Sequence, residues 1–170
     1  MASRMRPRLL LSGALLLCSA TAASAWEVET TTPDSFGHSS LTITGDILDA
    51  SSGEALIITC TSVNWIFATE GWTPGRIIDL SQSKGILSIG SKAAATTLSV
   101  RGTAWARNYG AYSSDGKENA RRAVTLLGSK DEFLVVSLYL PDGSRDEGKI
   151  YGDESGATAP DKFAAICGSK

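Results

Sequence analysis

Few residues of this 170-residue chain have the type and spacing that enzyme chemistry requires. His38 is the single histidine, and its glycine- and serine-rich surroundings are typical of a solvated loop. There is no G-x-S-x-G motif, and residues 85–92 have the glycine spacing of a phosphate-binding loop but end in Ser-Lys, where that motif needs Lys followed by Ser or Thr. The sequence therefore argues against a serine hydrolase and a P-loop, and it indicates no cofactor.

Carboxylates are the next candidates, for metal binding or for acid and base catalysis. Asp142, Ser144, Asp146 and Asp153 occupy positions 1, 3, 5 and 12 of an EF-hand-like loop, but Glu147 replaces the turn glycine and position 12 lacks a glutamate. We expect an acidic, solvated hairpin here and no metal. Neighbouring residues on a strand point to opposite faces, so no catalytic couple is indicated by the adjacent acidic pairs Asp131-Glu132, Asp146-Glu147 and Asp153-Glu154.

Aromatic and arginine side chains are more suggestive, because Trp, Tyr and Arg are enriched at binding hot spots. Residues 71–75 are rich in turn-forming types, and residues 108–116 have the composition of a loop. We predict that these two segments, with the adjacent Arg76, present a contact surface that contains Trp72, Arg76, Tyr109 and Tyr112; the alternative is that the aromatic residues, Trp72 above all, belong to the core.

Other aromatic residues are expected to be structural. Trp65 and Trp105 are interleaved with core-type residues, and we place both in the core because a tryptophan of a small β domain is highly buried on average. Arg101 and Arg107 lie near Trp105 and extend the aromatic and basic set.

The N-terminus has the pattern of a secretory signal. Three arginines within the first eight residues precede an apolar run at 9–17 that is shorter than the roughly 20 residues of a spanning helix. Ala23-Ser24-Ala25 then predicts cleavage before Trp26, which leaves residues 26–170 as one exported domain without a membrane anchor. Cys18 could instead be acylated, but Leu17 before it is not the small residue that lipoprotein processing favours. We expect a bacterial periplasmic or secreted protein.

Net charge and chain length further limit the ligands and the number of domains to be expected. Loss of the signal leaves 13 basic against 18 acidic residues, a net charge of −5 that argues against binding nucleic acid or an anionic membrane. The remaining 145 residues suit a single domain with its own core.

Two cysteines remain after cleavage, and an oxidising compartment allows them one intramolecular pairing. We therefore predict a disulfide between Cys60 and Cys167. The alternative is two unpaired buried thiols, and their spacing does not fit a zinc motif.

Hydrophobic patterning predicts a mainly β protein: a single small antiparallel sandwich or barrel with one or two short helices, one of them C-terminal. Turns are predicted at 51–54 and 141–144. Strands are predicted at 40–48, 55–63, 65–69, 76–80, 85–89, 96–106, 132–140 and 149–151. Helices are predicted at 117–127, where 124–126 could also start a strand, and at 159–167 with Thr158 as its cap.

Two hypotheses for function follow. The first is a non-catalytic exported binding domain that contacts an unknown protein or an envelope glycan, which includes an inhibitor of a secreted enzyme. The second is a carboxylate-based hydrolase of the cell envelope, for which no recognisable site is assembled.

Overall fold

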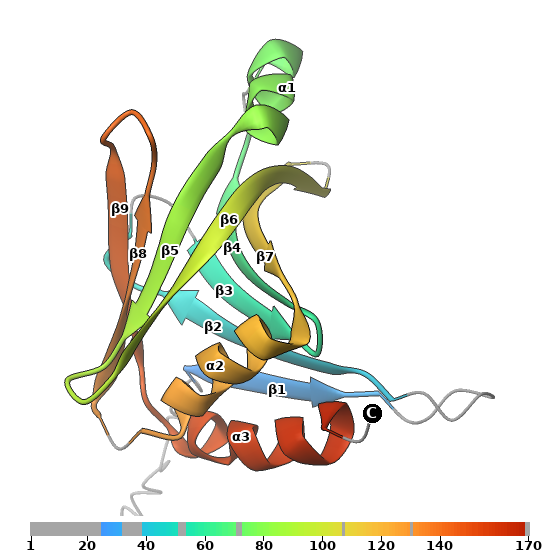
Figure 1. The fold of residues 1–170 in the computed structure, drawn as a ribbon, viewed down its shortest axis with the longest axis vertical. Coiled ribbons are helices and arrows are strands. Elements are labelled where there is room, and N and C mark those ends of the chain that lie inside the picture. The colour runs from blue at the N-terminus through green and yellow to red at the C-terminus, as the bar shows by residue number, and fades with distance from the viewer. Residues whose placement is uncertain are drawn as a thin grey trace, which may run out of the picture.

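The computed structural model describes residues 25–31, 39–50, 54–70, 73–106, 108–129 and 131–168, without the side chains of residues 76 and 77. In this part of the chain, nine antiparallel strands form one sheet in the order β1-β2-β3-β4-β7-β6-β5-β8-β9 (Figure 1). The strands are β1 (Trp26–Thr30), β2 (Leu41–Ile47), β3 (Glu54–Thr59), β4 (Ser62–Ala68), β5 (Lys84–Gly90), β6 (Ala95–Ala106), β7 (Tyr109–Asp115), β8 (Phe133–Tyr139) and β9 (Arg145–Tyr151). The helices are α1 (Pro74–Gln82), α2 (Lys117–Leu127) and α3 (Glu154–Cys167). The predicted mainly β fold with a C-terminal helix is confirmed, in the form of a nearly closed barrel.

Apolar side chains that alternate with polar ones along the strands fill the interior of this barrel. In β2, Leu41, Ile43 and Ile47 are buried, while Thr42 and Thr44 between them are partly exposed. Because successive side chains of a strand point to opposite faces, one face of each strand supplies the core and the other forms the outer wall.

The barrel closes where the end of β2 meets β9. The main-chain N–H groups of Leu48 and Lys149 each donate to the carbonyl oxygen of the other residue at 2.8 Å. Gly148 makes this approach possible, because a Cβ atom there would lie 2.3 Å from Ile47 Cγ2 and 2.5 Å from Leu48 O. A glycine is thus required for sterically close packing at the seam.

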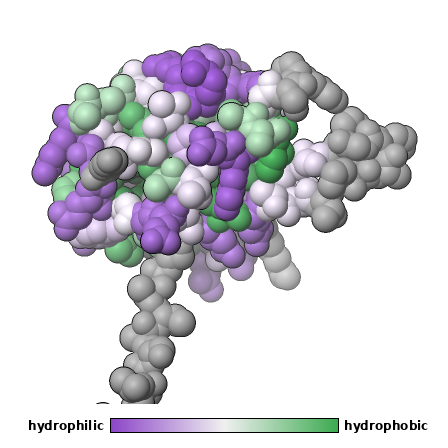
Figure 2. Space-filling view, turned by 90° about the horizontal axis from the view of Figure 1, so that it is seen from below, coloured by the Kyte–Doolittle hydropathy of each residue, from purple (hydrophilic) through white to green (hydrophobic). Residues whose placement is uncertain are grey.

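Helices α2 and α3 cover one end of the barrel (Figure 1). Helix α2 buries Ala120, Ala123, Val124 and Leu127 against strands β3 to β7, and it also packs on α3, which contacts β1 and β2. Figure 2 views the molecule from this end and shows mainly hydrophilic residues, with separate hydrophobic patches between them. Within the described residues, no helix combines the length and apolar character needed to cross a bilayer.

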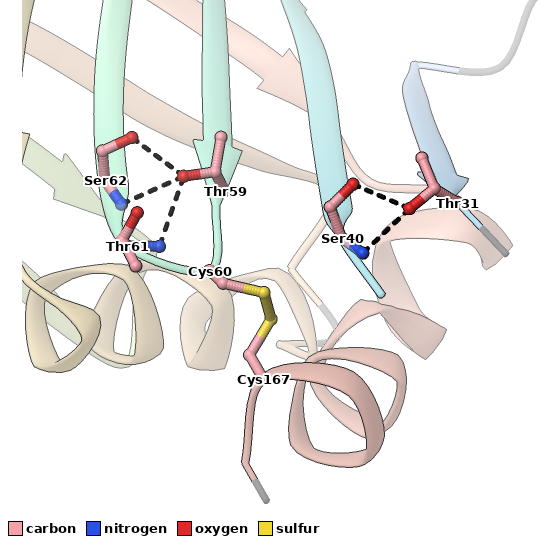
Figure 3. The surroundings of a disulfide bond; sticks show 7 residues. All are labelled: Thr31, Ser40, Thr59, Cys60, Thr61, Ser62 and Cys167. Atoms are coloured by element: carbon pink, nitrogen blue, oxygen red, sulfur yellow. Dashed lines mark hydrogen bonds between the residues drawn. A yellow bond between two sulfur atoms is a disulfide. The ribbon is translucent and has the colours of Figure 1, made fainter. Parts of the chain in front are cut away.

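The predicted disulfide is present and fastens α3 to the sheet (Figure 3). Cys60 lies in the turn between β3 and β4, rather than inside one continuous strand as expected. The Thr59 hydroxyl oxygen accepts from the main-chain N–H groups of Thr61 and Ser62, at 3.2 and 3.1 Å, and so supports this turn. Polar groups that bond to nearby backbone favour turns, which explains the break at 60–61.

Three other segments correct the sequence prediction. Residues 109–115 form strand β7 instead of a loop, and residues 76–80 belong to helix α1 instead of a strand. Helix α3 begins at Glu154, with Asp153 as its cap, rather than at Ala159 with Thr158 as its cap.

The physical reason for these differences is clearest for β7. Its composition is typical of a loop, but pairing with β4 and β6 supplies the backbone hydrogen bonds that make it a strand. Its Gly110 is a packing requirement, since a Cβ atom there would lie 2.8 Å from atoms of Leu80 and Phe67.

Candidate binding groove

The four side chains predicted to form one contact surface are not brought together. Tyr109 is 46% exposed, whereas Tyr112 on the same strand is only 7% exposed. Trp72 and the side chain of Arg76 lie outside the described residues. Of this set, Tyr109 alone is a described and exposed aromatic residue.

Tyr112 faces the interior of the barrel, so the expectation that it is exposed is wrong. It pairs with Trp65 on β4 and with Gly102 on β6, both on the inward side. Its ring stacks on Phe67 at 5.7 Å between centroids, and its hydroxyl shares a 3.0 Å hydrogen bond with Ser83. Tyr112 is therefore a core residue whose polar end is satisfied.

The two tryptophans expected in the core have different positions. Trp65 is buried, as predicted, but Trp105 is 43% exposed, which corrects the expectation for that residue. The pairing of β6 with β7 shifts register between Ala104 and Ala106, so Trp105 lies in a bulge. Trp105 follows Ser99, Arg101 and Thr103 at spacings of two, so it lies on the outward face of β6, and the bulge leaves it unpaired.

Trp105 borders a shallow groove of about 460 Å³ on the outer wall over β4, β7 and β6. Asn64, Ser113 and Arg101 lie side by side across these three strands, because Ser113 pairs with both of the others. Thr103 lies between Arg101 and Trp105 in the lining of the groove. The groove therefore presents hydroxyl groups and a guanidinium beside one large aromatic ring, while the Asn64 amide is buried in its floor.

Hydrogen bonds hold the polar lining in place. The Asn64 side chain is buried, and its Nδ2 donates to Ile57 O at 3.2 Å and to Ser62 Oγ at 3.0 Å. At one end, Asn119 of α2 donates from Nδ2 to Ser114 Oγ at 3.0 Å and to Asp115 O at 2.9 Å. These contacts fix the orientation of the two amide groups before any ligand arrives.

The lining of the groove is better suited to hydrogen bonding and apolar contact than to hydrolysis by a pair of carboxylates. Among the described residues that line it, Asp115 is the single carboxylate, whereas acid and base hydrolysis of a glycoside uses two. Hydroxyl, amide and guanidinium groups supply hydrogen bonds, and Trp105 supplies a flat apolar surface.

A sequence signal for this groove exists in β6. The strand alternates core residues, such as Leu98 and Val100, with polar or aromatic ones. The outward face of β6 is therefore formed by residues spaced two apart: Ser99, Arg101, Thr103 and Trp105. The contributions of β4, β7 and α2 have no such signal, because they depend on which strands become neighbours.

A second groove, of about 340 Å³, lies on the outer wall over β5, β8 and β9. Two of its charged groups are engaged with each other: Arg145 forms an ion pair with Glu147 and lies 5.1 Å from the Tyr139 ring, and Ser137 Oγ donates to Glu147 at 2.6 Å. Lys92, Asp131 and Glu132 are the other charged residues of its described lining.

Two acids, the buried Glu54 and the partly buried Asp146, meet inside the barrel. Asp146 pairs with the inward Leu138, while Glu147 pairs with the outward Ser137, as expected for adjacent residues of a strand. The pKa of Glu54 is raised to about 8, mainly by burial and in addition by the charge of Asp146 and a hydrogen bond with it. A hydrogen bond with Trp65 acts in the opposite direction. Sequence reasoning missed this pair because it compared only acids adjacent along the chain.

This pair is structural rather than catalytic. Glu54 is only 5% exposed, whereas a catalytic acid must contact its substrate. Its Oε2 atom has no hydrogen-bond partner among the described residues, so ionisation would leave a poorly compensated buried charge.

The acidic residues of the hypothetical calcium loop make separate hydrogen bonds. Asp142 Oδ1 accepts from Ser144 N at 2.8 Å and from Ser144 Oγ at 2.6 Å, and these bonds lower the pKa of Asp142. Asp153 caps α3. Across the described ranges, no three His, Cys, Asp or Glu side chains are grouped so as to hold a metal ion, and His38 lies outside those ranges.

Comparison of the chain with protein-family models, with curated proteins and with solved structures finds no significant match.

Proposed function

We propose that this protein is a non-catalytic binding domain, exported to the periplasm or beyond, that holds a hydroxyl-rich glycan in the groove beside Trp105. The observation that carries the proposal is the exposed Trp105 next to a row of polar side chains on the outer wall. A tryptophan ring offers a large rigid contact area to the apolar face of a sugar ring. Ser, Thr, Asn and Arg side chains can hydrogen-bond the hydroxyl groups around that ring.

The charge of the groove supports a neutral glycan. Arg101 and Asp115 are the charged residues among the described lining, and they carry opposite signs. The net charge of −5 expected for the chain after signal removal also disfavours strongly anionic polymers. A neutral sugar with hydroxyl and N-acetyl groups matches this balance.

Export is supported by the basic and apolar N-terminus and by the disulfide, which is typical of oxidising compartments. The other hypothesis, a carboxylate-based hydrolase, would need two carboxylates that reach one substrate. Glu54 and Asp146 are the pair that comes close, and the burial of Glu54 counts against this use.

The test is calorimetric titration of the protein with oligomers of glucose and of N-acetylglucosamine. We expect Trp105→Ala to weaken binding by about 30-fold, which corresponds to the roughly 2 kcal/mol of a hot spot, without lowering the melting temperature. The matched control is Tyr151→Ala, which removes a comparably exposed aromatic residue from β9 and should leave affinity unchanged. Absence of binding to both oligomers, or equal effects of the two variants, would contradict the proposal.

A further inference from the structure

One carboxylate joins the start of helix α3 to the start of strand β1. Asp153 Oδ1 accepts from the main-chain N–H of Gly156 at 2.8 Å and so caps α3. Asp153 Oδ2 accepts from the main-chain nitrogen of Trp26 at 3.0 Å, across 127 positions of sequence. The nitrogen of Trp26 is therefore held at a negatively charged group.

The position of that nitrogen is defined by tight packing of the Trp26 ring, which is only 1% exposed. A Cβ atom at Gly45 of β2 would lie 2.5 Å from the ring, and one at Gly156 of α3 would lie 2.7 Å from it. Neither neighbour could carry a side chain without displacing the indole, so the ring fits closely between β2 and α3.

Trp26 is also the residue that the sequence places directly after the Ala23-Ser24-Ala25 cleavage pattern. We propose that removal of the signal turns the Trp26 nitrogen into an α-ammonium group that pairs with Asp153, so that processing itself strengthens the attachment of α3. The inference rests on the predicted cleavage site and is independent of the proposed glycan groove.

The chemical step is hydrolysis of the Ala25–Trp26 amide by a signal peptidase. The hydroxyl of a water molecule adds to the carbonyl carbon of Ala25, and the bond from that carbon to the Trp26 nitrogen breaks. The nitrogen takes up the proton of the water and, at neutral pH, the proton released by the new carboxylic acid. An amide with one N–H donor thereby becomes an ammonium with three.

The charge change matters because hydrogen bonds between ionised groups are about twice as strong as neutral ones. Asp153 is partly buried, which limits screening by solvent. Helix α3 ends at Cys167, which is bonded to Cys60, so both ends of the helix would then be attached to the sheet: one by the ion pair and one by the disulfide.

A double-mutant cycle tests this proposal. The chain that begins at Trp26 is compared with the same chain acetylated on its α-amino group, each with Asp153 intact and with Asp153→Asn. Asparagine caps helices as well as aspartate does, so Asp153→Asn removes the charge but retains the cap. We expect acetylation to lower the folding equilibrium constant by roughly fivefold at pH 7 when Asp153 is present and to have little effect in Asp153→Asn.

Glu154→Gln serves as the matched control, because it removes the adjacent exposed carboxylate and should leave the effect of acetylation in place. A chain that begins at Ala25 carries its ammonium one residue before the Trp26 nitrogen. Its stability should match that of the acetylated chain, and this comparison remains possible if Asp153→Asn does not fold. Equal effects of acetylation with and without Asp153 would overturn the proposal. So would an intact mass showing that the exported protein begins elsewhere than at Trp26.

Discussion

Cys60 and Cys167 are bonded across 107 positions of sequence, with their Cα atoms 5.3 Å apart. The bond joins the turn that follows β3 to the last residue of α3, the helix that also covers β1 and β2. It therefore holds the C-terminal helix on the sheet that it shields.

Removal of this bond should destabilise the protein substantially. In the chain-entropy description, closing a loop of about 100 residues contributes roughly 4.7 kcal/mol. We expect reduction, or the double substitution Cys60→Ser and Cys167→Ser, to lower the free energy of unfolding by a few kcal/mol in urea denaturation. After signal removal, the oxidised protein should contain no thiol that reacts with an alkylating reagent, even when the chain is unfolded. Identical urea midpoints for the oxidised and reduced protein would contradict this prediction.

The buried acid Glu54 should make stability depend on pH. Its pKa is raised from 4.5 to about 8 in the folded state, so above pH 4.5 the folded protein retains a proton that the unfolded chain releases. The contribution of Glu54 to stability is thus complete below pH 4.5 and declines as the pH rises towards 8, by up to about 1.4 kcal/mol per pH unit. Unfolding free energies measured between pH 4 and 9 check this slope.

Glu54→Gln should flatten that slope, because the amide resembles the protonated acid and does not ionise. Glu29→Gln, which changes an exposed residue of β1, is the control and should retain the slope. If Glu54→Gln and the unmodified protein lose stability in parallel as the pH rises, the buried acid is not responsible.

The aromatic residues should separate into stabilising and surface groups. Trp65→Ala is expected to cost about 3–5 kcal/mol, because it leaves a cavity in the core. Tyr112→Phe should cost about 1 kcal/mol through loss of the hydrogen bond with Ser83. Tyr109→Ala and Trp105→Ala should change stability much less than Trp65→Ala. Thermal and urea denaturation of the four variants gives the ranking, and a destabilised Trp105→Ala comparable to Trp65→Ala would refute it.

Closure of the barrel should depend on Gly148. An added Cβ at this position would collide with Ile47 Cγ2 and with the carbonyl oxygen of Leu48, and the latter is backbone that cannot rotate away. We expect Gly148→Ala to cost about 1–3 kcal/mol through this overpacking. Gly75→Ala in α1 meets no atom within 4 Å and is the control, with a small gain expected from reduced chain entropy. Chemical denaturation of the two variants measures the difference, and equal stabilities would show that the seam tolerates a methyl group.

Local patterns in the sequence were sufficient where one face of an element meets the core. Helix α2 was predicted with its observed bounds because its apolar residues recur at helical spacing, and β2 was predicted within one residue at each end because its apolar residues alternate. The disulfide was also predictable, because two remaining cysteines in an oxidising compartment have one intramolecular pairing.

Tertiary contacts decided the rest. Residues 109–115 have the composition of a loop, yet they form β7 because β4 and β6 supply hydrogen bonds on both sides. The groove beside Trp105 combines residues of three strands with Asn119 of α2, and the strand order that brings them together cannot be read from local spacing. Glu54 and Asp146 likewise meet because the sheet curls until β9 reaches β2. Periodicity determines which face of an element is buried, but long-range pairing determines which faces lie together, and the groove and the acid pair both depend on that pairing.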